Sequence, residues 1–229
     1  MELPRETTPV GKCLSLALYS QTLLQEFSDS ELLRGLAQTL VSAATPLEAA
    51  QREYRDAVQQ IVVARTRVKL ADYRADRIVR RVSHAVEGED GGKGGRIAAA
   101  VFPSGLNPVV RPVGTTQVDE LRKLEGLLEA QAGRWPGATE QMAAVAEART
   151  FYEQALTARA EATQRSAGLR AQRDMAKEDF LDVYATVAGR IRAEYPRDRD
   201  TQDLFFDAVS RRRRGSSPDT DDDEEDDAA

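Results

Sequence analysis

The chain has 229 residues, of which 31% are charged, 41% are apolar and only 6% are aromatic, and its formal net charge is −6. This apolar content is low for a thick globular core and is typical of long helices, whose surface is large for their volume. The only cysteine, Cys13, excludes an internal disulfide and a zinc site built on several thiolates, and it favours a reducing, cytoplasmic location.

The first segment, residues 1–12, is predicted to be a disordered lead, because Pro4, Pro9 and Gly11 interrupt any regular element. The leucines that follow Cys13 are separated by polar residues. The run is therefore too short and too mixed to cross a membrane or to act as a signal sequence, and no membrane insertion is predicted.

A helical hairpin is predicted over 13–87. Apolar residues recur at helical spacing from Cys13 to about Ala43, and a capping-box pattern at Ser28 allows either one kinked helix or two helices here. Thr45 and Pro46 are typical of a helix start, since threonine can cap the helix and proline fits its first turn. The second helix of the hairpin is therefore expected to begin at Thr45.

This second helix carries a strict heptad repeat. Alternate steps of three and four from Leu47 give twelve apolar positions: Leu47, Ala50, Tyr54, Ala57, Ile61, Ala64, Val68, Ala71, Ala75, Ile78, Val82 and Ala85. One of the two repeating positions is alanine in five of six repeats. Small side chains let a neighbouring helix approach closely, which favours an antiparallel pair with coiled-coil-like packing. We call these twelve heptad positions the seam. Further valines beside the seam widen the apolar face of the helix and favour a bundle of several helices.

Residues 88–115 form a Gly/Pro-rich linker and strap. The glycines between Gly88 and Gly95 predict a flexible linker. Three prolines within 97–113 exclude a long helix, so we expect an extended strap there, with short β pairing as the alternative. The strap is expected to lay its apolar residues on the bundle, namely Val101, Phe102, Leu106, Val109 and Val110.

Helices are predicted again over 116–210, packing on 13–87: one over 117–131, a long one over 139–194 and a short one from Asp200. Residues 211–229 combine a basic block with an acidic, disordered tail. The predicted fold is all-α: an elongated bundle of four to six long, Ala-rich antiparallel helices with coiled-coil-like heptad packing, an extended strap and a disordered C-terminal tail.

The sequence predicts no catalytic, metal or cofactor site. His84 is the only histidine, and it has no evident co-ligands near it in the sequence. The pair Gly92-Lys93 lacks the earlier glycine and the following serine or threonine that a phosphate-binding loop requires. We therefore expect a protein that is not an enzyme.

An arginine stripe is the first candidate contact surface. Arg67, Arg74 and Arg81 are seven residues apart, and Arg77 lies between them on nearly the same helix face. Two interpretations remain open. The stripe contacts nucleic-acid phosphates or an acidic partner, or it is a solvated face with internal pairs such as Asp76–Arg80.

The C-terminal residues form a second candidate contact surface. Phe205 and Phe206 are adjacent in the short last helix, and the basic block Arg211, Arg212, Arg213 and Arg214 precedes seven acids from Asp221 to Asp227. The two rings dock a partner, or they close the hydrophobic end of the bundle.

The leading functional hypothesis is a scaffold or adaptor that acts through protein–protein interaction. The alternative is a nucleic-acid-associated protein that uses the arginine stripe and the basic block, restrained by the acidic tail. A third hypothesis is an enzyme whose active site lies under the strap. The sequence does not identify a protein partner, and it is compatible with a homo-oligomer.

Overall fold

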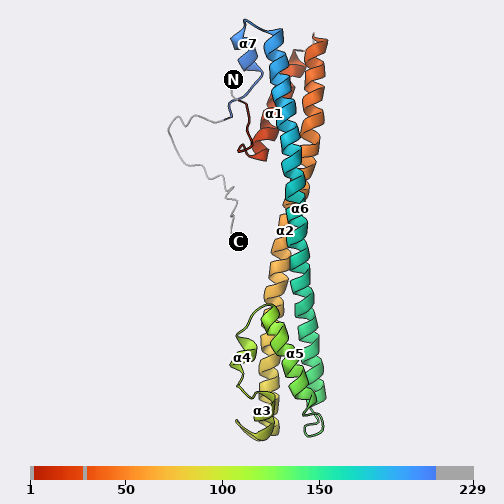
Figure 1. The fold of residues 1–229 in the computed structure, drawn as a ribbon, viewed down its shortest axis with the longest axis vertical. Helices are drawn as coiled ribbons and strands as arrows, with labels where there is room; N and C mark the ends of the chain where they lie inside the picture. The colour runs from red at the N-terminus through yellow and green to blue at the C-terminus, as the bar shows by residue number, and fades with distance from the viewer. Residues whose placement is uncertain (1–2, 28–29, 210–229) are drawn as a thin grey trace, which may run out of the picture. The chain divides into compact units, whose positions relative to one another are not determined.

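The computed structural model describes residues 3–27 and 30–209, and within them it contains helices and no strands (Figure 1). Helices account for 80% of these residues, which confirms the all-α fold class. They are α1 (Val10–Glu26), α2 (Glu31–Glu89), α3 (Arg96–Val101), α4 (Asn107–Val110), α5 (Thr115–Glu129), α6 (Ala138–Glu194) and α7 (Arg199–Leu204). This described part thus has more helices than the four to six predicted, because α3, α4 and α7 are short pieces of six residues or fewer.

The chain divides into two compact units. Unit 1 comprises Met1–Glu48 and Met175–Ala229, and unit 2 comprises Ala49–Asp174. The boundary falls inside both long helices, α2 and α6. The predicted segments 13–87 and 116–210 therefore each contribute residues to both units.

The start of α2 differs from the prediction. The helix begins at Glu31, where the Oγ of Ser30 accepts a hydrogen bond from the backbone N–H of Leu33 at 3.4 Å, and it continues through Pro46. The hydroxyl of Thr45 donates to the carbonyl of Val41 and does not cap a new helix. The proline removes one helical hydrogen bond, but the buried leucines in the adjoining turns stabilise the continuous helix.

The predicted lead 1–12 also differs where it is described. Helix α1 begins at Val10, and Thr8 and Val10 are buried. The Oγ1 of Thr8 accepts a hydrogen bond from the backbone N–H of Arg5 at 2.9 Å, which closes a turn directly before Pro9 and the helix. Burial of this turn explains why the residues do not behave as a free lead.

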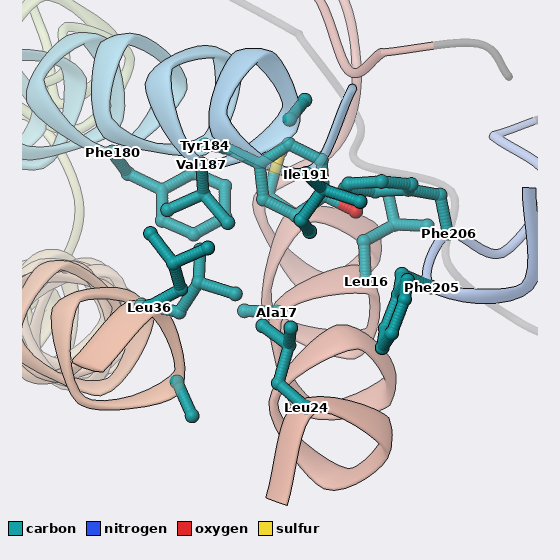
Figure 2. Packing of buried hydrophobic residues seen from close by; sticks show 14 of the residues in the cluster. Leu16, Ala17, Leu24, Leu36, Phe180, Tyr184, Val187, Ile191, Phe205 and Phe206 are labelled. Atoms are coloured by element: carbon teal, nitrogen blue, oxygen red, sulfur yellow. The ribbon is translucent and has the colours of Figure 1, made fainter. Parts of the chain in front are cut away.

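Unit 1 has an aromatic core (Figure 2). Phe180 and Tyr184 of α6 pack with leucines of α1 and α2, and Phe206 meets Tyr184 edge-on at 5.8 Å between ring centroids. The hydroxyls of Tyr184 and Ser20 share a buried hydrogen bond of 3.0 Å. Burial raises the pKa of Tyr184 to about 12, so this phenol stays protonated and keeps its hydrogen bond.

Unit 2 is built on α2 and α6, which run antiparallel here. Tyr54 lies under Arg173, while Asp72 contacts Tyr152, so residue numbers rise on one helix as they fall on the other. The predicted heptad positions from Ala50 to Ala85 are all buried or partly buried in this unit. Figure 1 shows α5 alongside this pair of helices.

The strap is helical where an extended chain was predicted. Asp90 accepts hydrogen bonds from the backbone N–H groups of Ile97 and Ala98, at 3.2 and 2.7 Å, and so starts α3. Pro108 occupies the first turn of α4, where its missing N–H costs nothing. The predicted burial holds, since Val101, Phe102, Leu106, Val109 and Val110 all join the core of unit 2.

The small seam positions of α2 provide a test of close packing. Ala57 and Ala64 are 5% and 6% exposed. Ala57→Leu or Ala64→Leu should overpack the contact and lower the free energy of unfolding by about 1–3 kcal/mol, measured by thermal or urea denaturation. Ala49→Leu, at an exposed position of the same helix, is the matched control. Equal stability of all three variants would show that the seam is not tightly packed.

Candidate functional site

The seam between α2 and α6 in unit 2 has two flanks, and α5 covers one of them. Val118, Leu121, Leu124 and Leu128 of α5 are buried against this pair in a common core. On α2 the same flank contributes Val79 and Val86, which are also fully buried. A third helix therefore closes this side with an apolar stripe at helical spacing.

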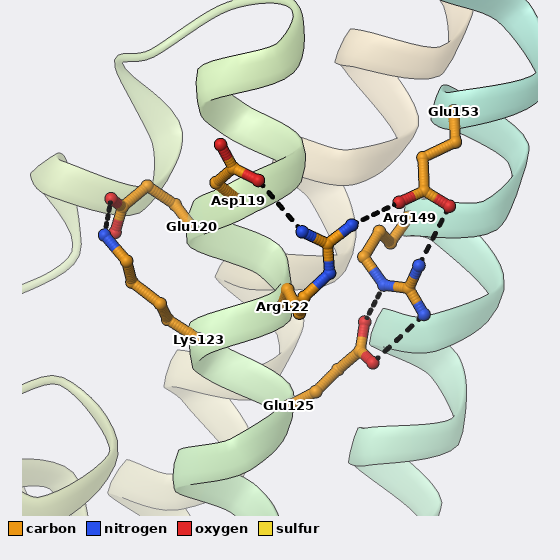
Figure 3. A network of polar contacts seen from close by, with 7 residues as sticks. All are labelled: Asp119, Glu120, Arg122, Lys123, Glu125, Arg149 and Glu153. Carbon is orange, nitrogen blue, oxygen red and sulfur yellow. Dashed lines mark hydrogen bonds and ion pairs between the residues drawn. The ribbon is translucent and has the colours of Figure 1, made fainter.

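Ion pairs border the covered flank (Figure 3). Arg149 of α6 binds Glu125 of α5 through two nitrogens, at 2.6 and 3.3 Å, and also reaches Glu153 at 2.9 Å. Arg122 of α5 bridges Glu153 and Asp119 at 2.8 and 3.0 Å. These contacts hold the pKa of Arg149 above its ordinary value, with the hydrogen bond to Glu125 as the main cause. The basic residues that border this flank are thus matched by acids.

Two acids of α2 take part in this covered flank. Asp76 accepts a hydrogen bond of 2.8 Å from the side-chain amide of Gln117, and Asp72 accepts one of 3.2 Å from the hydroxyl of Tyr152. Burial is the main cause that raises the pKa of Asp76, and the neighbouring charge of Asp72 adds to it. Asp76 therefore serves mainly to attach α5, and no ion pair with Arg80 is formed within 4.0 Å among the described residues.

The other flank of the seam is open and forms a groove of about 420 Å³ between α2 and α6. A second hollow of about 370 Å³ shares Leu70, Arg74 and Phe151 with it and extends it along the helices. The apolar side chains of the groove include Leu70 and Tyr73, which are 42% and 57% exposed. We call the two hollows together the open groove.

The structure brings the four arginines of the predicted stripe together at this groove. Arg74, Arg77 and Arg81 line its first hollow, and Arg67 with Arg74 lines the second. Within the described residues, no carboxylate oxygen lies within 4.0 Å of their guanidinium nitrogens. The guanidinium of Arg74 lies 4.7 Å from the ring centroid of Phe151, and that of Arg77 lies 5.8 Å from the ring of Tyr73. These are cation–π contacts, which orient the arginines without neutralising them.

The groove exists because the facing residues on this flank are small. Its α6 wall contains alanines at 144, 148, 155 and 158, which do not fill the space beside the seam. Phe151 is the one large apolar residue of this wall. Sequence reasoning found the stripe but missed Phe151 as its companion, because only the antiparallel pairing of α2 with α6 places them together.

The remaining candidate residues lie elsewhere. Phe205 and Phe206 are buried in the core of unit 1. This burial agrees with the interpretation in which the two rings close the hydrophobic end of the bundle. The basic block Arg211, Arg212, Arg213 and Arg214 lies outside the described residues.

Neither a membrane span nor a metal centre emerges from the described ranges. No helix there has both the length and the apolar character needed to cross a bilayer. No group of three or more potential metal ligands comes together among these residues. Comparison of the chain with protein-family models, curated proteins and solved structures found no match.

The ion pairs of the covered flank predict how firmly α5 is attached. The side chain of Arg149 is 19% exposed and that of Arg122 is 58% exposed. Arg149→Gln should lower the free energy of unfolding by about 1–3 kcal/mol, because it leaves the partly buried Glu125 without its partner. Arg122→Gln should cost less than about 1 kcal/mol, as is usual for exposed pairs. Denaturation at low and high salt measures both, and an equal cost for the two variants would contradict the assignment.

Proposed function

We propose that the protein is a non-enzymatic adaptor or scaffold that binds a partner protein through the open groove of unit 2. The observation that carries this proposal is the set of four arginines that line the groove without a carboxylate partner in the described residues. On the covered flank of the same two helices, the bordering arginines are paired.

The unpaired arginines have an energetic cost. Arg74 and Arg77 are three residues apart, and Arg77 and Arg81 are four apart, so like charges face one another along the helix. Such pairs destabilise a helix by about 0.2–0.5 kcal/mol each. An acidic partner would offset this repulsion, which supports a binding role for the stripe over a solvated face.

The apolar side chains beside the arginines favour a protein partner. Tyrosine and arginine are enriched at protein interfaces, where aromatic rings supply contact area at a low entropic cost. The groove offers Tyr73 and Leu70, both well exposed, and the partly buried ring of Phe151. A partner that covers these residues would gain hydrophobic free energy as well as charge neutralisation.

A coiled-coil arrangement of α2 with α6 is part of this proposal. The unbroken heptad of α2 and the alanines at its small position support knobs-into-holes packing, which would present the groove as a straight, stiff surface. A cytoplasmic location accords with the single cysteine, which is buried.

Site-specific crosslinking in the native cell tests the proposal. A photoreactive phenylalanine analogue in place of Tyr73 should give a discrete crosslinked protein, because this position lines the groove. The same analogue in place of Val113, which is 70% exposed in unit 2 but outside the groove, is the control. The product at position 73 should disappear when Arg74→Glu and Arg81→Glu are added, since the charge match is then reversed.

Products that are identical at positions 73 and 113, or that persist after both charge reversals, would refute a specific partner at the groove. The folded state of each variant is checked by circular dichroism, so that a lost product is not caused by unfolding.

Nucleic acid is the second candidate partner, favoured by the exposure of the same four arginines. In this case the acidic run Asp221–Asp227, which six residues separate from the end of the basic block at Arg214, would compete with the nucleic acid. Deletion of residues 219–229 should then tighten binding to DNA or RNA, and the gain should shrink as the salt concentration rises. Titration of the full and the shortened chain at two salt concentrations measures this. Negligible binding by both chains at low salt would exclude it.

A further inference from the structure

We infer that the open groove binds a further helix beside α2, α5 and α6. This helix is acidic and amphipathic and is supplied by a partner protein. This inference rests on the proposed function and names the partner by its chemistry. It follows from a comparison of the two flanks of the same helix pair within unit 2.

Helix α5 shows how this helix pair receives a third helix. It buries a stripe of apolar residues spaced three and four apart, and beside that stripe Glu125 meets Arg149. Glu125 and Arg149 are partly buried, with side chains 17% and 19% exposed. Helix α5 thus docks on this pair through an apolar stripe and through charged residues beside it, among them an acid that pairs with an arginine of the pair.

The open groove offers the complementary half of the same arrangement. Leu70, Ile78 and Phe151 provide an apolar floor. Arg67, Arg74 and Arg81 stand above it at seven-residue intervals, which correspond to about 10.5 Å along the helix. Acids spaced seven residues apart on a docked helix have the same spacing, so each arginine would find one acid while the apolar stripe covers the floor.

The charges argue against the other occupants. A second copy of the chain, docked groove to groove, would bring arginines against arginines. The chain's own acidic run, Asp221–Asp227, has the right charge but contains no apolar residue to cover Leu70 or Phe151. A phosphate backbone would leave the apolar floor without a partner.

Three synthetic peptides test the inference, each about six helical turns long. The first carries leucines on one face and glutamates on both sides of that face. The second replaces every glutamate with lysine, and the third scrambles the first so that it keeps its composition but loses its amphipathic pattern. Fluorescence anisotropy measures their binding to the full chain and to the chain without residues 219–229.

The first peptide should bind, and the other two should bind at least about tenfold more weakly. Arg74→Glu together with Arg81→Glu should weaken the first peptide by at least about tenfold, and Leu70→Ser should also weaken it. Arg80→Glu is the matched control, because Arg80 is on the same helix but does not line the groove, and it should leave binding nearly unchanged. Removal of the acidic tail should change the affinity little.

The inference is overturned if the first peptide does not bind, or if the scrambled acidic peptide binds equally well, since charge alone would then explain the binding. It is also overturned if a DNA duplex, and not the peptide, binds in a manner that depends on Arg74 and Arg81. A protein crosslinked at Tyr73 together with a failed peptide experiment would retain the proposed function and reject the acidic helix.

Discussion

The architecture of unit 2 depends on the close approach of two helices through small side chains. Alanine at the repeating positions of α2 removes the bulk that would keep α6 at a distance, and the antiparallel contacts from Tyr54–Arg173 to Asp72–Tyr152 follow from that approach. The same smallness has a second effect. Where the α6 wall is also largely alanine, the flank of the seam is hollow. Helix α5 covers one flank, and the other holds the open groove.

The two flanks of the seam differ in the pairing of their charged residues as well as in their packing. Near α5, the partly buried Arg149 is held by acids, and the partly desolvated Asp76 accepts a hydrogen bond from Gln117. At the open groove, the guanidinium groups of Arg74 and Arg77 lie over aromatic rings, and all four arginines of the stripe are exposed. Aromatic contacts of this kind keep arginine charge available, whereas ion pairs neutralise it. The open flank therefore leaves its arginines without ion pairs, whereas the covered flank uses its arginines to hold α5.

Much of this could be predicted from the sequence, and the failures have physical causes. The heptad from Leu47 to Ala85 predicted burial correctly because periodicity reports directly on which face is covered. Pro46 was misread as a helix start, since local capping signals do not account for the leucines buried on either side of it. The strap was predicted to be extended, but it contains the short helix α3. The carboxylate of Asp90 caps this helix from seven residues before Ile97, and sequence rules for helix caps consider only nearer residues. The arginine stripe was visible in the sequence, whereas its partner Phe151 depends on tertiary pairing.

The continuity of α2 and α6 across the boundary at Glu48 and Asp174 has a consequence for folding cooperativity. Starting a helix is costly, while extending one adds a hydrogen bond per residue. Once either unit has folded, the parts of α2 and α6 in that unit are nuclei from which both helices can extend into the other unit. The free energies of unfolding of the two units are therefore coupled through the helical backbone. Pro46, which lacks an amide hydrogen, lies two residues before Glu48, so the hydrogen-bond ladder of α2 is interrupted close to this boundary. Along α6 the helical residues around Asp174 include no proline, so the backbone hydrogen bonds of this helix can continue without a gap from one unit into the other.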